Sequence, residues 1–335
     1  MKLRNIFSII TTILLVITSC RIDTIDYTKP SDEIDISVVR YDILLDEYVK
    51  YNSFSALQKM NTEHIQATKL LIENIVSIGR VNESNITEKL KVFYSDTTLL
   101  QLMEDVETQF PDLKDLEVTL TKGFRNLHKE IPSMRIPQIY AQISALNESI
   151  IVDDTLLCIS LDKYLGEDYP VYQRYYYDYQ RQSMNPDRIA PDCFTYYLQS
   201  EYPFPVYLKP TLLNVMLHEG KINYVVKQLL EYATEEEVMG YSDKEKKWCK
   251  ENQQKIWKYM VNNQHLHSTN LTLTRKYTGI EPIKLFREDV PLQVGIWLGS
   301  NIISSYMKHN KQVTLFDLLH ITDYQRILES SQYNP

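Results

Sequence analysis

The residues best suited to chemistry are a histidine and a glutamate that stand side by side, His218 and Glu219. Zinc peptidases place two histidines four residues apart on one helix, with a catalytic glutamate after the first, because one turn brings both imidazoles to one metal ion. Here the second histidine position holds Ile222, whose aliphatic side chain cannot bind zinc. The pattern therefore predicts that this segment holds no zinc and cleaves no peptides.

The helix expected around these residues places Glu219 within an apolar face. Leu212, Val215, Ile222 and Val226 lie on the same side as the carboxylate. A carboxylate among apolar residues needs a cation, a metal or a proton. We therefore expect a structural ion pair, so that Glu219→Gln would strand a buried cation and destabilise the fold. The alternative is a working carboxylate, because perturbed carboxylates also occur at active sites. The arginines considered as partners are Arg174, Arg181 and Arg188.

The segment from 212 to 230 carries apolar residues on more than one face, which predicts a core helix that is packed all round. Gly220 lies inside it, although glycine costs ~1 kcal/mol relative to alanine in a helix. Its presence predicts that another backbone passes close by. Gly295 and Gly299, four residues apart in a later helical segment, are the candidate neighbours.

The remaining histidines and cysteines give no clear metal site. His265 and His267, together with His218, keep open a metallopeptidase with a different ligand set, but we interpret them as solvated or helix-capping residues. The cysteines beyond Cys20 are odd in number and widely spaced, which favours buried free thiols over a disulfide framework or a thiolate zinc site. They are Cys158, Cys193 and Cys249.

Tyrosine is abundant, with 25 residues, and it is concentrated between Tyr172 and Tyr179. An aromatic surface of this kind can bind a protein or a glycan. Tyrosines packed at the rim of a core would give the same pattern, and both interpretations stay open.

Composition excludes several classes of partner. The net charge is −8 with scattered Lys and Arg, which argues against a nucleic-acid surface. Only eight glycines occur in 335 residues, which argues against a glycine-rich phosphate-binding loop. We therefore expect no nucleic acid, no nucleotide and no cofactor.

The first residues resemble a secretion signal. Lys2 and Arg4 precede an uncharged, largely apolar run over 6–18, as in a signal peptide. The run has about a dozen residues, fewer than the ~20 that a membrane-spanning helix needs. We expect residues 1–19 to be removed.

The residues Ile17-Thr18-Ser19-Cys20 resemble the bacterial lipobox, whose cysteine receives a diacylglyceryl thioether. The two or three acyl chains of a mature lipoprotein hold it firmly to a membrane. The sequence thus predicts membrane attachment through lipid on Cys20, followed by a polar tether over 20–33. No linker or repeat interrupts residues 34–335, which favours a single domain.

Helical periodicity dominates the domain, and three short apolar segments interrupt it. The fold class predicted is mainly α (α+β), with one small antiparallel sheet before a second helical half. The expected strands are 136–143, 148–152 and 156–161. The expected helices are 40–51, 62–78, 97–110, 113–129, 191–201, 210–231, 243–262 and 291–309, with two short turns after Val313 and Asp323.

Several separate segments resemble the gliding-motility lipoprotein GldB family of the Bacteroidetes. The resemblance covers most of the chain from Leu156 onward and reaches the last residue. Its segments are Asp162-Lys163-Tyr164-Leu165-Gly166, Arg188-Ile189-Ala190-Pro191-Asp192, Glu219-Gly220-Lys221 with Tyr224, Trp248-Cys249 with Trp257, Val294 to Gly299, Ser305-Tyr306-Met307 with Asn310, and Ile327 to Pro335.

That family in turn resembles zincin-type peptidases, in which an HExxH helix follows a small sheet and a later helix supplies a third, glutamate ligand. The resemblance implies a degenerate zincin-like domain in which Glu219 matches the third ligand. The helix near Pro191–Tyr197 then matches the HExxH helix, yet it contains no histidine. Asp192, His218, Lys221 and Tyr224 accordingly become degenerate-site or structural residues, with no catalytic residue and no metal.

The resemblance implies a noncatalytic envelope lipoprotein that stabilises or scaffolds other envelope proteins. Surface-displayed lipoproteins of the Bacteroidetes usually carry an acidic run directly after the lipidated cysteine, but here the acids at Asp23 and Asp26 are spaced out. This favours a protein that faces the periplasm. Two alternatives stay open: an active metallopeptidase with an unrecognised ligand set, and a lipoprotein that binds glycans or proteins through its tyrosines.

Overall fold

The structure is a computed structural model that describes residues 31–206, 209–280, 283–285 and 288–335. The predicted signal peptide, Cys20 and most of the predicted tether lie outside these ranges. The last three tether residues form a short 3-10 turn, η1 (Ser31–Glu33). Within the described part, no helix combines the length and the apolar character needed to cross a membrane.

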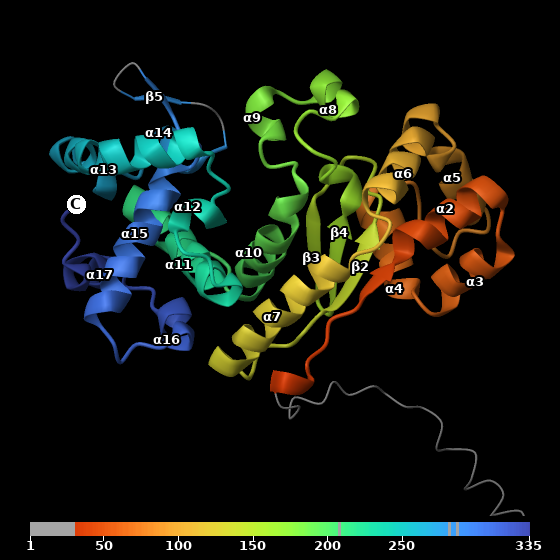
Figure 1. Cartoon of the computed structure of the whole chain (residues 1–335), viewed down its shortest axis with the longest axis horizontal. Coiled ribbons are helices and arrows are strands. Elements are labelled where there is room, and N and C mark those ends of the chain that lie inside the picture. Colours follow the sequence, from red (N-terminus) through yellow and green to blue (C-terminus); the bar gives the residue numbers. More distant parts are fainter. Residues whose placement is uncertain (1–30, 207–208, 281–282, 286–287) are drawn as a thin grey trace, which may run out of the picture.

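A small sheet lies between two groups of helices (Figure 1). Helices α2 (Tyr41–Tyr51) to α6 (Thr97–Gln109) lie on one side of it, and the C-terminal helices α11 (Leu212–Leu230) to α17 (Tyr324–Ser331) form the opposite end of the molecule. Helices α7 (Lys114–Glu130) and α10 (Ile189–Glu201) lie between the sheet and α11 and pack against it. The predicted mainly α class, with a small sheet before a second helical half, is confirmed.

The sheet has the order β1-β2-β4-β3 and is mixed. Its parallel pairs are β1 (Val38–Arg40) with β2 (Gln138–Gln142) and β2 with β4 (Leu156–Ser160); only β3 (Ile150–Asp153) runs antiparallel to β4. The prediction of an antiparallel sheet is therefore wrong. Every residue of β4 is buried, as is typical of an interior strand, so β4 lies between β3 and β2. Because β3 reverses the chain before β4, β4 must run parallel to β2.

Three strands, β1, β5 (Ile283–Leu285) and β6 (Glu288–Val290), were not predicted. Strand β1 has three residues and joins α2 directly, and the hairpin of β5 and β6 is equally short. Three residues are too few to show a period of two. Of the β1 residues, only Arg40 was assigned to an element, as the start of the helix expected over 40–51.

The predicted helix 62–78 is confirmed to within three residues at either end, over 65–75, although it is divided in two and a separate helix precedes it. The structure has α3 (Phe54–Thr62), a break, α4 (Ile65–Lys69) and the π-helical turn η2 (Leu70–Ile75). The Thr68 hydroxyl donates to the Met60 carbonyl at 2.6 Å and thereby bridges the break. Helix α5 (Ile86–Tyr94) follows and was not predicted.

The other predicted helices are confirmed to within three residues at either end. A capping box between Thr211 and Asn214 begins α11, and one between Ser242 and Glu245 begins α13 (Asp243–Asn262). The remaining elements after β4 are η3 (Leu161–Lys163), α8 (Pro170–Tyr175), α9 (Asp178–Arg181), η4 (Pro186–Arg188), α12 (Glu235–Val238), η5 (His265–His267), α14 (Leu271–Thr278), α15 (Val294–His309) and α16 (Leu315–His320).

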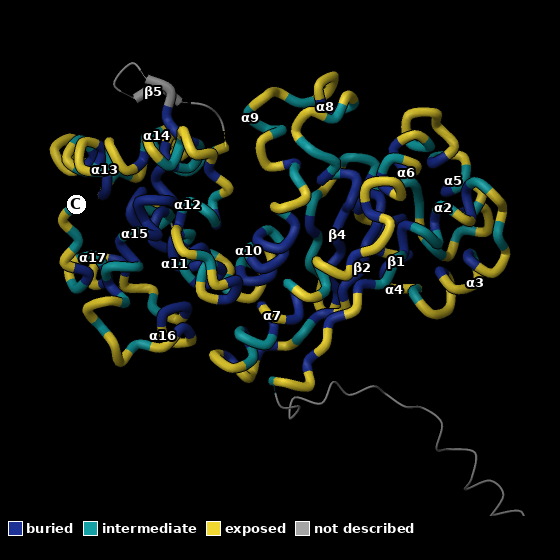
Figure 2. The backbone as a smooth tube through the Cα atoms, in the orientation of Figure 1, coloured by how far each residue is buried: buried dark blue, intermediate teal, exposed yellow. Residues whose placement is uncertain are grey.

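Helices α11 and α15 cross at two glycines. A Cβ atom built on Gly220 would lie 2.5 Å from the Gly299 carbonyl carbon, and one built on Gly299 would lie 2.0 Å from the Met216 carbonyl oxygen. The predicted approach of Gly220 to Gly299 is confirmed. Gly295 does not take part, since its hypothetical Cβ meets Tyr277 of α14 instead. Figure 2 shows α11 and α15 as largely buried helices, as expected for the centre of the C-terminal half.

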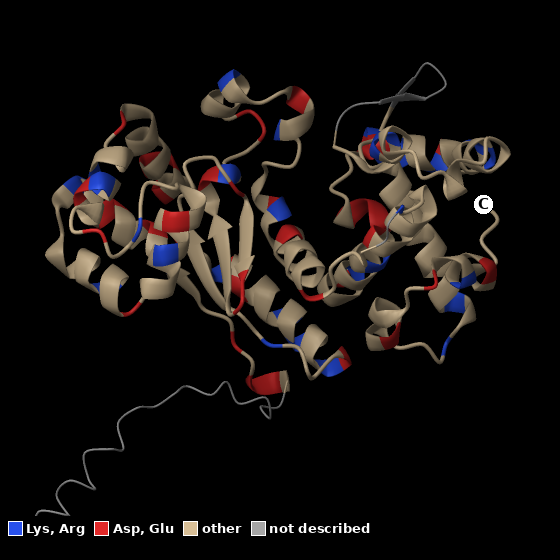
Figure 3. Cartoon of the chain, turned by 180° about the vertical axis from the view of Figure 1, so that it is seen from behind, with Lys and Arg blue, Asp and Glu red and all other residues tan. Residues whose placement is uncertain are grey.

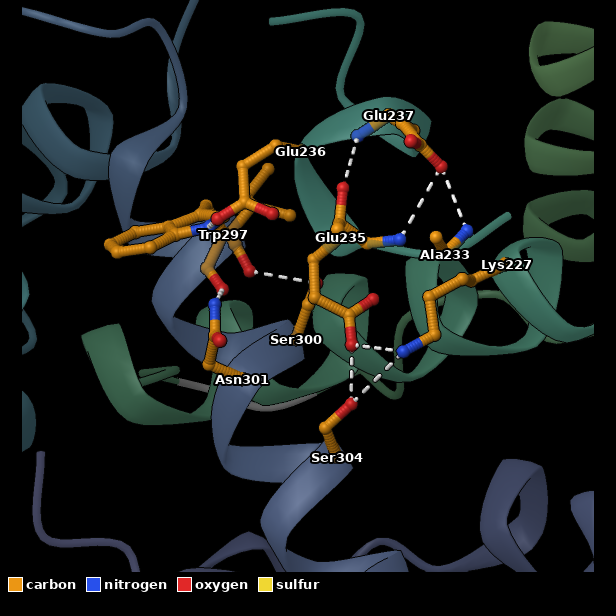
Figure 4. A network of polar contacts seen from close by, with 11 residues as sticks. Lys227, Ala233, Glu235, Glu236, Glu237, Trp297, Ser300, Asn301 and Ser304 are labelled. Carbon is orange, nitrogen blue, oxygen red and sulfur yellow. Dashed lines mark hydrogen bonds and ion pairs between the residues drawn. The ribbon is translucent and has the colours of Figure 1, made fainter. Parts of the chain in front are cut away.

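A buried polar network ties α12 to the same two helices (Figure 4). The Glu235 Oε1 atom accepts hydrogen bonds from Lys227 Nζ at 2.6 Å and from the Ser304 hydroxyl. The neighbouring Glu236 accepts a hydrogen bond from the Trp297 indole at 2.9 Å. Glu235 is 5% exposed, so this ion pair belongs to the interior rather than to the surface.

Acidic and basic residues alternate over both ends of the molecule (Figure 3). The salt bridges pair them locally, often within one helical turn, as in Lys50–Asp46 and Lys247–Glu251. Charged residues thus occur on many elements, and α12 carries three consecutive glutamates, Glu235 to Glu237.

Candidate functional site

Helix α11 presents its polar residues in different directions. Glu219 is half-buried and faces α10, where the Gln199 amide donates to its Oε2 atom at 2.7 Å. Burial raises the pKa of the Glu219 carboxyl, and the hydrogen bond from Gln199 opposes this shift. The carboxylate therefore has a neutral partner on the neighbouring helix.

The predicted ion pair of Glu219 with arginine is wrong. Among the described residues, no lysine or arginine forms a salt bridge with Glu219; Arg181 pairs with Asp178 and Arg188 pairs with Asp192. Arg188 lies one helical turn before Asp192 and forms its salt bridge with that carboxylate rather than with Glu219. Gln199 lies two further turns along α10, where that helix faces α11.

This correction changes the expected effect of removing the Glu219 charge. A glutamine at position 219 can still hydrogen-bond to Gln199 and strands no cation, so Glu219→Gln should change the free energy of unfolding by less than about 1 kcal/mol. Thermal unfolding at pH 7, compared with that of the wild-type protein, measures this. A loss of several kcal/mol would indicate a cationic partner for the carboxylate.

His218 is 3% exposed, so its interpretation as a solvated residue is wrong. Its Nδ1 atom lies 3.0 Å from the Tyr324 hydroxyl, and its ring meets Phe204 edge-on. Burial, together with the nearby Lys221 charge, lowers the pKa of His218 to about 4. The imidazole is consequently neutral at pH 7 and serves packing between α11 and α17.

Acid should therefore weaken the fold through His218. The unfolded histidine has a pKa near 6.5 and the folded one about 4, so the unfolded state binds more protons between these values, and stability falls as the pH falls through this window. The steepest slope that one group gives is about 1.4 kcal/mol per pH unit. His218→Gln should show a shallower fall in melting temperature between pH 6.5 and 4 than the wild-type protein. Parallel curves for the two proteins would contradict this assignment.

Lys221 is also buried, at 1% exposure. Its ammonium donates to the carbonyls of Leu319 and Ile321, at 3.1 Å and 2.7 Å, and lies 5.2 Å from the centre of the Tyr324 ring. Burial lowers the pKa of Lys221 to about 8. The lysine thus binds the C-terminal end of α16 and is directed away from Glu219.

Tyr224 lies beside a separate cavity of about 340 Å³, between α7, α11 and the turn before α16. Lys227 places its ammonium 5.3 Å from the centre of the Tyr224 ring. The structure therefore separates Tyr224 from the other predicted site residues.

Asp192 lies on α10 and accepts hydrogen bonds from the Tyr164 hydroxyl at 3.0 Å and from Arg188 at 3.1 Å. Burial raises the pKa of its carboxyl, and the Arg188 charge opposes the shift. Asp192 faces a cleft of about 370 Å³ between the α8–α10 segment and the chain around α12 and Leu292. Thr195, Tyr196 and Gln199 face the same cleft from α10. Together with Asn223 of α11, they make this cleft the candidate site.

The residues around the cleft do not form a metal centre. Within the described ranges, no three His, Cys, Asp or Glu side chains are grouped so that they could hold a metal ion. The three cysteines are buried and free, as predicted, and burial raises the pKa of Cys193 on α10 well above its usual value. A thiolate nucleophile is therefore not available there at neutral pH.

A comparison with family models decides the family. The model described as "Gliding motility protein GldB" matches residues 24–335. The chain belongs to the GldB family. The short name of the model, GldB_lipo, indicates a lipoprotein. Searches of curated proteins and of solved structures found no match.

Some of the segments that resemble the GldB family contribute residues to the cleft, and others form the helix crossing. Tyr164, Arg188 and Asp192 line the cleft, and Gly220 and Gly299 form the crossing. Gln199 was missed by the sequence analysis, although it lies seven residues after Asp192 and thus on the same helix face. That spacing could have identified it.

Proposed function

We propose that this GldB-family chain is a noncatalytic lipoprotein of the cell envelope that stabilises or scaffolds other envelope proteins. Lipid on Cys20 holds it to a membrane, and the domain faces the periplasm. The lipobox at Cys20 and the family match that starts at Thr24, four residues later, support this proposal.

The short tether limits how far the domain reaches. About ten residues separate Cys20 from the first described residue, Ser31, and an extended chain spans at most ~3.5 Å per residue. Ser31, where the domain begins, would therefore stay within roughly 35 Å of the lipid headgroups. This proximity suits partners that are themselves anchored in, or bound to, the same membrane.

The observation that carries the noncatalytic role is the pairing of Glu219 with Gln199. In the proposed relation to zincin-type peptidases, α10 takes the place of the HExxH helix and Glu219 that of the third ligand. Asp192 and Tyr196, four residues apart on α10, both face the cleft beside α11, and neither is a histidine. The carboxylate instead accepts a hydrogen bond from an amide.

Metal analysis and a peptidase assay test the noncatalytic role. Freshly purified, tag-free protein should contain well under one zinc per chain and should release no fragments from an unfolded protein substrate. One zinc per chain together with cleavage, both lost in Glu219→Gln, would show a metallopeptidase with a different ligand set.

Lipidation at Cys20 gives a separate prediction. Replacing Cys20 by alanine removes the thiol that receives the diacylglyceryl group, so the protein should no longer incorporate labelled palmitate or enter the detergent phase. Cys158→Ala, at a buried position, should leave both properties unchanged and serves as the control. Labelling that persists in Cys20→Ala would contradict lipidation at this residue.

A further inference from the structure

The cleft beside α10 has the size of a ligand site. Its volume of about 370 Å³ falls within the ~300–1,000 Å³ typical of small-molecule pockets. One wall comes from Tyr176, α9 and α10, and the other from Val238 at the end of α12 and the residues before α13 and α15. Nothing in the proposed scaffolding role uses this space.

Tyrosine rings form much of the lining. Tyr196 on α10 is 44% exposed, and Tyr179 on α9 stacks on Tyr177 with 5.7 Å between ring centres and 8° between planes. This stack limits the rotation of Tyr179 at the rim. Tyrosine offers a flat apolar face and a polar edge, and its side chain has few rotamers to lose on binding. The other lining tyrosines are Tyr164, Tyr176 and Tyr241.

Side-chain amides supply the uncharged hydrogen-bonding groups. Gln182, Gln199, Asn223 and Gln293 line the cleft from both walls. An amide carries donors and an acceptor side by side, as a hydroxyl group of a ligand does. The Gln199 NH₂ group donates a hydrogen bond to Glu219. The Gln199 carbonyl oxygen can therefore accept a hydrogen bond from a ligand hydroxyl group.

The charged groups of the lining are already paired within the chain. Arg188 binds Asp192, and Lys163 donates to the Leu146 carbonyl at 3.2 Å and lies 3.0 Å from the Tyr176 hydroxyl. Glu245 accepts hydrogen bonds from Ser242 at the start of α13. A charged ligand would have to compete with these partners, whereas a neutral, hydroxylated ligand would not.

We propose that the cleft binds a neutral oligosaccharide. Sugar rings would lie against the faces of Tyr179 and Tyr196, where their C–H groups meet the aromatic surface. Their hydroxyl groups would exchange hydrogen bonds with amides such as Gln182, which is exposed, and Gln199. The proposal goes beyond scaffolding and does not depend on it. The cleft can bind a sugar whether or not the chain also holds other proteins.

Calorimetric titration of the purified full chain with neutral oligosaccharides tests this proposal. The probes are chitotetraose, cellotetraose and maltotetraose, with a hyaluronan tetrasaccharide as the acidic comparison and an unfolded, uncharged peptide as the polypeptide comparison. At least one neutral probe should bind with a dissociation constant below ~1 mM, more tightly than either comparison. Binding of none of the neutral probes, or tighter binding of the acidic sugar or the peptide, would overturn it.

Variants locate the site. Tyr196→Ala and Tyr179→Ala should each weaken binding about tenfold or more, while Tyr179→Phe, which keeps the ring face, should bind within about threefold of wild type, a difference of ~0.7 kcal/mol. Tyr175→Ala is the matched control, since Tyr175 is 68% exposed on α8 and outside the lining. Equal affinity of Tyr179→Ala, Tyr175→Ala and the wild-type protein would overturn the assignment, even if Tyr196→Ala fails to fold.

Discussion

Replacing Gly299 by alanine is expected to lower the free energy of unfolding by about 3 kcal/mol, the upper part of the range for overpacked cores. The new methyl group would lie 2.0 Å from the Met216 carbonyl oxygen, which belongs to the backbone of α11. A flexible side chain could move aside, but here two helices would have to separate. The better helix propensity of alanine stabilises the variant by only about 1 kcal/mol. The clash is larger, so the net effect on the free energy of unfolding is a loss.

Thermal unfolding measures this effect. A loss of about 3 kcal/mol corresponds to a melting temperature lower by roughly 6 °C or more for a domain of this size. Lys308→Ala, at an exposed position on the same helix, should change the melting temperature by less than about 2 °C and serves as the control. A Gly299→Ala protein as stable as this control would mean that α11 and α15 do not cross at the two glycines.

Removing one partner of the buried ion pair Lys227–Glu235 should lower the free energy of unfolding as much as Gly299→Ala does. Glu235→Gln leaves the Lys227 ammonium with an amide in place of its carboxylate (Figure 4). The side chain of Lys227 is 14% exposed there and that of Glu235 is 6% exposed. Stranding a buried charge typically costs about 3–5 kcal/mol. The exposed pair Lys247–Glu251 offers the control, because Lys247→Met there should cost less than about 1 kcal/mol.

A double variant shows that the cost comes from the unpaired charge. Lys227→Met combined with Glu235→Gln removes both charges and should be more stable than Glu235→Gln alone, since no buried cation remains. Denaturant unfolding of the wild-type protein, Glu235→Gln, Lys227→Met and the double variant gives the coupling energy between the two side chains. Additive effects would show that the two side chains do not interact and would contradict the network around α12.

The sequence predicted the helices well because long amphipathic segments carry a strong 3.6-residue period. Helix α13 is an example, with both ends as expected. The register of the sheet was not predicted, because β1 has three residues and the order of strands depends on which of them is buried on both faces. The break before α4 depends on a Thr68 side-chain hydrogen bond, which no periodicity reveals.

The site was predicted only in part, because the sequence shows the types of the site residues but not which residues of other elements contact them. Asp192 and Glu219 were both identified, but their partners come from other elements: Tyr164 from the turn after β4, and Gln199 from the far end of α10. His218 and Lys221 were recognised as polar residues of α11, whereas their burial depends on α16 and α17 packing over them. Such contacts between distant segments leave no spacing in the sequence.

Crosslinking in living cells tests the scaffolding role most directly. The lipidated chain would carry a photoreactive residue at an exposed position such as Phe54 or Val118, and captured proteins would be identified by mass spectrometry. The scaffolding role predicts a small, reproducible set of envelope proteins, captured by the lipidated chain and lost with Cys20→Ala. Capture no greater than that by an unrelated lipoprotein of equal abundance, at each exposed position tried, would contradict it.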